Sequence, residues 1–186
     1  MLDKAIPDAA VLRQLLRYEP ETWKLFWLPR PREMFKSENS FLTWNSRFSG
    51  KEAFTYVDHA GYKTGNILSV KNYAHRIIWT MENGGIPHGR HIDHINGDKT
   101  DNRMSNLRLA TQAENNRNSC LRSDNKTGVK GVSWLSSRNK FVADICVNGA
   151  RKRIGYFDTK EEAKAAYVFM AESFHGQFAL HNRPNP

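Results

Sequence analysis

Apolar positions in the first part of the chain change their spacing, and each change predicts a different element. Residues 11–16 place apolar side chains at helical spacing after Asp8, a residue type that commonly caps helix N-termini. Residues 22–28 (TWKLFWL) predict a strand that the following prolines end. Short apolar runs separated by glycines between residues 53 and 70 predict further strands. Residues 1–72 therefore predict a small helix-plus-strands module, whose tryptophans we expect in the core.

The middle of the chain predicts a helix followed by a strand–turn–strand–helix (ββα) unit. Residues 73–85 (YAHRIIWTMENGG) carry a helical apolar pattern that should end near Asn83, before the paired glycines. A polar stretch from His91 follows, and then the letters LRLA alternate as in a strand. Thr111 and Glu114 form a capping box, which starts a helix. The ββα unit should run from about His91 to Asn118.

The last third of the chain predicts a sheet packed on one helix. Three strand-like segments occupy residues 128–135, 140–147 and 151–157 after a polar, glycine-ended linker at residues 119–128. A second capping box at Thr159 begins a helix that Gly176 should end. Its predicted apolar stripe consists of Ala163, Ala166, Tyr167, Met170 and Phe174.

Composition narrows the class of protein. The chain has 186 residues and a formal net charge of +9, so it should attract polyanions, of which nucleic acid is the most common. It has two cysteines without Cys-x-x-Cys spacing, which excludes a four-cysteine zinc site and disfavours a disulfide framework. We see no signal peptide and no membrane-spanning run, and therefore expect a soluble protein of the reducing cytoplasm.

Residues 91–102 (HIDHINGDKTDN) concentrate the chemistry. Hydrolysis of a phosphodiester needs a group that deprotonates water and a cation that neutralises charge on the leaving oxygen. A histidine suits the first task, contributing about 10²–10⁴ in rate. Asp and Asn oxygens suit Mg²⁺ or Mn²⁺ for the second. A hairpin could bring the first turns of the next helix, with Asn115, beside Asp93 and His94.

Simpler interpretations of the same segment explain less. An EF-hand calcium loop needs an oxygen ligand where Ile95 stands, and a closing glutamate that is missing. A structural hairpin turn explains the letters NGD but not the Asp-His pair together with the later asparagines. Zinc lacks thiol ligands here. His88 and His91 are interpreted as ordinary loop residues.

Residues 92–115 (IDHINGDKTDNRMSNLRLATQAEN) resemble the H-N-H nuclease motif in the ββα-metal form of phage and intron homing endonucleases. The resemblance implies that His94 is the general base and that Asn106 is the central asparagine that braces the loop. It also implies one divalent ion, most commonly Mg²⁺ or Mn²⁺, on Asp93 and Asn115. Asn115 replaces the last histidine, which makes an H-N-N variant. The preceding letters AHRIIW resemble the family too, and we expect them to serve packing or phosphate contact.

The shared site of Asp93 and His94 requires a particular backbone. Neighbours on a regular strand point to opposite faces. The two side chains can therefore meet one substrate only where the strand ends or bulges. The family resemblance implies such a strand end.

The C-terminal sheet should have a basic face. Between Leu121 and Phe157 there are eight Lys or Arg and two Asp. If alternate residues from Phe141 face the helix, the others face outwards, and Arg151 shares a face with Arg153. We interpret Lys130, Val132 and Trp134 as the matching row of the first strand. Such a sheet could lie in a DNA major groove, and a solvated charged edge is the alternative.

Residues 128–179 resemble the AP-two domain of plant ethylene-response factors, a three-stranded sheet plus helix that reads the major groove. Its most specific letters are YFDTKEEAKAAY. Cys146 stands where an arginine is usual and Arg153 where a tryptophan is usual, so the plant recognition site is not carried over unchanged. We expect DNA contacts from Lys130, Trp134, Arg138, Lys140, Arg151 and Arg153.

These patterns together predict an α+β protein in three parts. They are an N-terminal α+β module (1–72) that is a candidate for DNA binding, a ββα-metal nuclease (73–120) and an AP-two-like DNA-binding domain (121–186). The predicted function is metal-dependent cleavage of double-stranded DNA by a homing-type endonuclease, with no membrane and no obligate protein partner. Two alternatives stay open: a sequence-specific DNA-binding regulator with an inactive nuclease centre, and a structure-selective protein that binds RNA or branched DNA.

Overall fold

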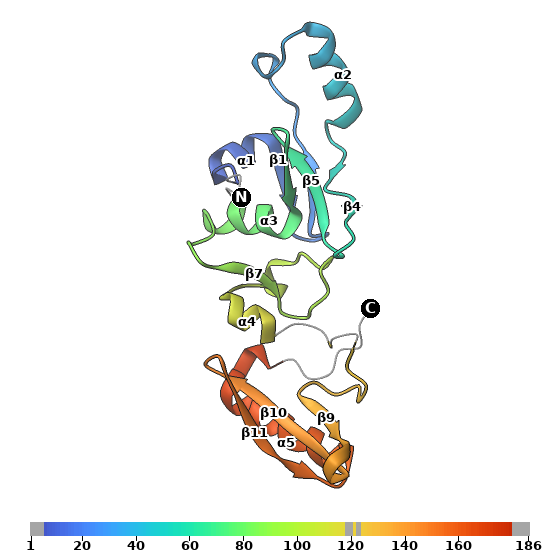
Figure 1. Ribbon diagram of the computed structural model, residues 1–186. Coiled ribbons are helices and arrows are strands. Elements are labelled where there is room, and N and C mark those ends of the chain that lie inside the picture. The colour runs from blue at the N-terminus through green and yellow to red at the C-terminus, as the bar shows by residue number, and fades with distance from the viewer. Residues whose placement is uncertain (1–5, 118–120, 122–123, 180–186) are drawn as a thin grey trace. The chain divides into compact units, whose positions relative to one another are not determined.

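The computed structural model describes residues 6–117, 121 and 124–179. The chain forms two compact units, Met1–Leu109 and Ala110–Pro186. The predicted α+β class is confirmed: small sheets and helices build the first unit, and the second contains a three-stranded sheet with a helix (Figure 1). Within the described part of the chain, no helix combines the length and the apolar character that crossing a membrane would require.

In the described part of the first unit, from residue 6 onward, there are three small sheets and three α-helices. Strands β1, β2 and β3 make one sheet, β4, β5 and β6 a second, and β7 pairs with β8 in a third. In chain order the elements are α1 (Ala9–Leu15), β1 (Leu16–Glu19), β2 (Lys24–Trp27), α2 (Glu38–Phe48), β3 (Glu52–Ala53), β4 (Tyr56–Val57), β5 (Lys63–Ile67), β6 (Val70–Tyr73), α3 (Ala74–Asn83), β7 (His91–His94) and β8 (Leu107–Ala110), with short 3-10 helices at Arg32–Met34 and Met104–Asn106.

Helix α1 begins and helix α3 ends where the sequence predicts, but Leu16, which was expected in the first helix, is the first residue of β1. The side chain of Asp8 accepts a hydrogen bond of 2.8 Å from the backbone N–H of Val11, which satisfies a free donor of the first turn. Helix α3 ends at Asn83 because Gly84 takes a φ of 82°, a left-handed conformation that is easy only for glycine. Both predicted helices are confirmed.

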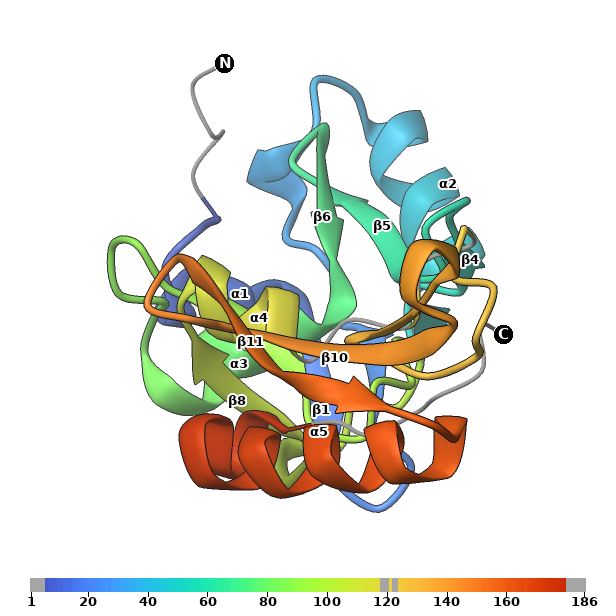
Figure 2. The same cartoon turned by 60° about the horizontal axis from the view of Figure 1, so that its bottom comes forward.

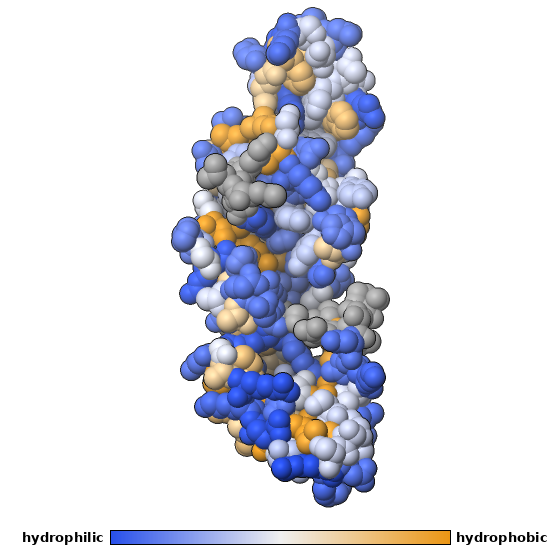
Figure 3. All heavy atoms as spheres, in the orientation of Figure 1, coloured by the Kyte–Doolittle hydropathy of each residue, from blue (hydrophilic) through white to orange (hydrophobic). Residues whose placement is uncertain are grey.

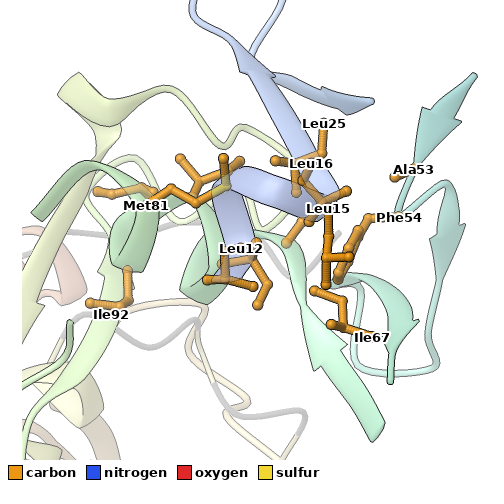
Figure 4. Packing of buried hydrophobic residues seen from close by; sticks show 13 residues of the cluster. Leu12, Leu15, Leu16, Leu25, Ala53, Phe54, Ile67, Met81 and Ile92 are labelled. Atoms are coloured by element: carbon orange, nitrogen blue, oxygen red, sulfur yellow. The ribbon is translucent and has the colours of Figure 1, made fainter. Parts of the chain in front are cut away.

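One apolar cluster joins the N-terminal elements to β7 and β8. Leu12, Leu16 and Ile77 are almost completely buried at its centre, and Ile92 of β7 and Leu107 of β8 belong to the same cluster. Figure 4 shows side chains from α1, β1, β2, β5, α3 and β7 pointing toward one another. Full burial of one large aliphatic side chain contributes about 1.5–3 kcal/mol. The strands that carry the polar segment therefore draw stability from residues far earlier in the chain.

The division into residues 1–72, 73–120 and 121–186 stays a prediction. Four residues of the linker expected at 119–128, namely 119, 120, 122 and 123, lie outside the described residues.

Helix α2 lies in the connection between β2 and β3 and was not predicted. Its Trp44 packs against Phe35 and Phe48, with ring centroids 6.1 and 5.4 Å away. The guanidinium of Arg30 lies 3.9 Å from the Trp44 ring centroid. The side chain of Asn45 bonds both the backbone N–H and the carbonyl of Arg30, at 2.9 and 3.0 Å. Trp44 also packs edge-to-face on Trp27, with ring centroids 5.8 Å apart, and Trp27 packs on the main cluster as predicted.

The second unit has the predicted sheet-plus-helix arrangement. Its elements are α4 (Gln112–Arg117), β9 (Val132–Leu135), β10 (Lys140–Val147), β11 (Ala150–Phe157) and α5 (Lys160–His175), with short 3-10 helices at Ser136–Arg138 and Gly176–Phe178. The antiparallel sheet has the order β11-β10-β9. Both capping boxes, at Thr111 and Thr159, are present. Helix α5 covers one face of the sheet (Figure 2).

The core of the second unit confirms the inward row of β10 and corrects the stripe of α5. Ala143 and Ile145 pack with Tyr167 of α5, as the alternation predicts. The buried residues of α5 follow a strict spacing of four: Ala163, Tyr167, Ala171 and His175. Phe174, which the predicted stripe included, is 47% exposed. It directly precedes the buried His175, so its side chain points away from the sheet.

Candidate functional site

The polar segment after β7 forms a loop that turns the chain immediately after His94. The N–H of Gly97 donates to the carbonyl of His94 at 2.8 Å, and Gly97 takes a φ of 70°. The N–H of Ile95 donates to the carbonyl of Asn106 at 2.7 Å, which closes the loop between the two strands. Strand β7 therefore ends at His94, where the expected site requires a strand end.

Asn106 holds this loop together from its far end. Its side-chain oxygen accepts from the backbone N–H of Asn96 at 2.8 Å. Its amide group donates to the side-chain oxygen of Asn96 at 2.9 Å and to the carbonyl of Asp101 at 2.7 Å. The side chain is buried, so these three bonds satisfy polar atoms that water does not reach.

Two loop carboxylates are engaged in the fold of the loop itself. Arg103 binds Asp101 through two nitrogens, and this hydrogen bonding holds the pKa of Asp101 below its usual value. Asp98 accepts from the backbone N–H and the hydroxyl of Thr100, which likewise lowers the pKa of Asp98. Both residues act as turn-forming side chains.

His94 is buried and oriented by a neighbour from the same loop. Its Nε2 lies 3.0 Å from Oδ1 of Asn102, itself only 1% exposed. An amide oxygen can only accept, so Nε2 carries the hydrogen and Nδ1 is the basic nitrogen of the neutral ring. Burial lowers the pKa of His94 below 6.5, although the bond to Asn102 and nearby carboxylates act in the opposite direction. The ring is therefore a neutral base at physiological pH.

Aromatic rings of the first unit surround His94. The centroid of the His75 ring lies 4.9 Å from that of His94, in an edge-to-face arrangement. The ring of Tyr62 contacts both histidines, with centroids 5.1 Å from His75 and 6.0 Å from His94. His75, from the segment AHRIIW, is thus a packing residue beside the candidate base.

We expect His75 to make the first unit sensitive to acid. Burial, with His94 and Arg76 nearby, lowers the pKa of His75 to about 3, while the unfolded chain titrates near 6.5. Between these values only the unfolded chain binds the proton. The contribution of His75 to stability is therefore complete above pH 6.5 and falls by up to about 1.4 kcal/mol per pH unit toward pH 3.

The variant His75→Gln, which cannot gain this proton, should show a shallower loss of unfolding free energy between pH 6.5 and 5. Urea titrations in EDTA, followed by tryptophan fluorescence, would measure it. Equal slopes for wild type and variant would contradict the expectation. The exposed His88→Gln is the matched control and should keep the wild-type slope.

Asp93 is held by a buried arginine of β8. Nε and Nη2 of Arg108 both lie 2.8 Å from Oδ2 of Asp93, and both side chains are at most a tenth exposed. The adjacent His94 contacts a different set of neighbours, as expected for consecutive strand residues.

These side chains fit a divalent ion that also binds oxygens of the substrate. They fit less well an ion that protein ligands surround completely. Within the described residues, no group of three or more His, Cys, Asp or Glu side chains could hold a metal. Asp93 supplies one carboxylate fixed by a neighbour, as metal-binding carboxylates usually are. Further oxygen ligands would have to come from amides, water or phosphate, which suit Mg²⁺ and Mn²⁺. Asn115 lies in the first turn of α4 in the second unit, so its assignment as a ligand rests on the motif.

The outer face of the second unit's sheet, opposite α5, is basic. Arg151 and Arg153 pair across the sheet with Cys146 and Asp144. Both arginines bind the buried Asp144, while their own side chains are 72% and 44% exposed. Figure 3 shows hydrophilic side chains over β10 and β11 in this view.

The row proposed for the first strand lies on the other face. Cross-strand partners share a face, and Val132 pairs with the inward Ala143 while Trp134 pairs with Phe141. The rings of Trp134 and Phe141 are 4.8 Å apart. Trp134 is 47% exposed although it belongs to the helix-facing row. The expectation that Trp134 and Val132 share the basic face is therefore wrong, since the register of β9 is offset by one residue.

Three further residues were expected to contact DNA, and each has a neighbour within the second unit. Arg138 is exposed and its guanidinium lies 4.6 Å from the ring centroid of Tyr156, on the outer face. Lys140 forms an ion pair with Asp158. Lys130 donates to the carbonyl of Arg117 at 2.6 Å.

Sequence reasoning missed three residues of these sites. Asn102 and Arg108 are polar, buried and bonded to His94 and Asp93. The letters DN and LRL contain them, but the sequence alone assigned neither residue a role. Tyr156 was not singled out, although it is 42% exposed on the basic face.

Part of the chain is similar to proteins described as HNH endonucleases. Residues 72–117 match a family model described as HNH endonuclease. A protein of Acanthamoeba polyphaga mimivirus, described as an uncharacterized HNH endonuclease, is 37% identical over 129 residues, which are 69% of this chain and 66% of that protein. This chain thus spans just under two thirds of the mimivirus protein. Protein 3.8 of Escherichia phage T7 is 35% identical over 105 residues, 56% of this chain and 86% of that protein. No solved structure matches the chain.

Proposed function

Because this chain belongs to the HNH endonuclease family, we propose that it hydrolyses a phosphodiester bond of double-stranded DNA with the help of a divalent metal ion. The observation that carries the proposal is the environment of His94. The ring is neutral at physiological pH, its tautomer is fixed by Asn102, and it lies at the end of β7 next to Asp93.

In this proposal His94 acts as the general base. Its Nδ1 takes a proton from the attacking water, and the hydrogen bond to Asn102 Oδ1 stabilises the cationic ring that results. Asn106 keeps the loop closed so that the ring stays in place during the reaction.

The divalent ion, Mg²⁺ or Mn²⁺, would be held by Asp93, by Asn115 according to the motif, and by phosphate oxygens. When bound, it neutralises the charge that develops on the leaving oxygen. Arg108 holds the Asp93 carboxylate in place through Nε and Nη2.

DNA binding is assigned to the outer face of the sheet, through Arg138, Arg151 and Arg153. The resemblance to an AP-two domain and the exposure of these guanidinium groups support it. Lys140, at the start of β10, would contact DNA from the end of that face. Lys130 and Trp134, which belong to the row on the helix-facing side, would contact DNA only around the edge of the sheet. A catalytic segment joined to such a domain is the arrangement of a homing-type endonuclease, and this is the type we assign.

The test is conversion of supercoiled plasmid that carries DNA from the protein's own source genome. We expect nicked or linear product with Mg²⁺ or Mn²⁺ and none with EDTA, and the nicked-to-linear ratio reports how many strands are cut. Tight, salt-sensitive binding without product in either metal would favour a regulator with an inactive centre instead. Stronger competition by RNA or branched DNA than by linear duplex would favour a structure-selective protein.

A further inference from the structure

The outer face of the sheet contains a buried carboxylate that a simple phosphate-binding surface would not need. Asp144 is 7% exposed and lies between the exposed guanidinium groups of Arg151 and Arg153. Its Oδ2 accepts from Nη2 of Arg151 at 2.6 Å, and its Oδ1 accepts from Nε of Arg153. The single carboxylate of Asp144 therefore orients both arginine side chains.

A β-bulge brings these three residues together. Ala143 pairs with Gly155, but the next residue, Asp144, pairs with Arg153, so Ile154 is an extra residue of β11. Ile154 packs on the core of the unit. With regular pairing Asp144 would face Ile154, and Arg153 would stand opposite the inward Ile145. The bulge therefore places Arg151 and Arg153 on the outer face.

Tyr156 extends the same arrangement. Its hydroxyl accepts from Nη1 of Arg153 at 2.7 Å, and the guanidinium groups of Arg138 and Arg153 lie 4.6 and 5.0 Å from its ring centroid. Arg153 is thus held at two nitrogens and stacked on a ring, while nearly half of its side chain stays exposed.

We propose that Asp144 is a positioning residue for base recognition, which holds Arg151 and Arg153 so that this face reads base edges in duplex DNA. The inference rests on the proposed function, since it takes duplex DNA as the ligand. Neutralising phosphates requires charge but little order, and a carboxylate beneath the arginines lowers the local positive charge. Fixed guanidinium planes are instead what bidentate recognition of guanine requires.

Selection from a random-sequence duplex library, with the full chain in EDTA, tests this. Wild type should enrich a sequence motif. Asp144→Asn should lose about fivefold to 100-fold of the preference for that motif over unselected duplex. Its affinity for unselected duplex should be equal or higher, because the formal net charge rises from +9 to +10. Asp158→Asn raises the charge equally without touching Asp144 and should keep the wild-type preference.

Each outcome bears on the inference. Equal preference in wild type and Asp144→Asn would overturn it, and so would a wild type that enriches no motif. If Asp144→Asn does not fold, as its unfolding transition would show, Arg153→Lys and Tyr156→Phe keep the charge and should still lose preference. Plasmid cleavage with Mg²⁺ is measured separately, so cleavage without a motif overturns only this inference, and a motif without cleavage overturns only the proposed nuclease activity.

Discussion

Replacing His94 with alanine should lower the rate of DNA cleavage by about 10²–10⁴, the usual contribution of a general base. The affinity for uncleaved DNA should stay close to that of wild type, because His94 is buried and the basic face belongs to the other unit. Single-turnover cleavage of a plasmid at saturating protein and Mg²⁺ would measure the rate, and binding in EDTA would measure the affinity.

The control for this variant comes from the same strand. His91→Ala removes an exposed imidazole three residues earlier and should cleave at the wild-type rate. Added imidazole should restore part of the activity of His94→Ala, because the vacated space lies beside the site where the proton is taken. Cleavage by folded His94→Ala at more than a tenth of the wild-type rate would exclude His94 as the base. His94→Gln, which preserves more of the packing, serves if the alanine variant is unstable.

Residues 72–117, the segment that matches the HNH endonuclease model, should be unfolded when produced alone. It retains six buried residues of the main cluster, but seven others, among them Leu12 and Leu16, lie outside it. Leu25, Phe54 and Ile67 are lost as well. Each buried side chain of this size contributes about 1.5–3 kcal/mol, and a whole domain is stable by only about 5–15 kcal/mol.

Circular dichroism and a thermal scan would test the fragment. Residues 72–117 should show neither a helical spectrum nor a cooperative transition, whereas residues 1–117 should show both. A cooperative transition in the short fragment would mean that the apolar cluster contributes less to β7 and β8 than its burial indicates.

The sequence predicts elements best where a local signal and an apolar pattern agree. Helix α3 combines the two, since Gly84 ends it where the apolar pattern ends, and the capping box at Thr159 does the same for the start of α5. Helix α2 lacks buried residues, so its apolar pattern gave no comparable signal. Phe174 was misplaced because apolar side chains occur on two faces of α5, and only contact with the sheet selects one.

The candidate site was predictable in its motif residues and not in their partners. The letters of the motif identify Asp93, His94 and Asn106. The bonds from Asn102 and Arg108 depend on how the loop and β8 fold back, which no spacing rule expresses. Likewise, alternation places Arg151 and Arg153 on a common face, but it cannot say which face when the pairing shifts inside the strand.

The bulge in β11 also governs how this strand can change in evolution. Ile154 is the extra residue, so its loss would leave Arg151 and Arg153 opposite the same partners, at the expense of one core contact. Loss of Lys152 instead would turn Arg151 toward α5. We therefore expect insertions and deletions among relatives to concentrate at the position of Ile154, and a change of length elsewhere in the strand to mark a lineage that reads a different DNA sequence.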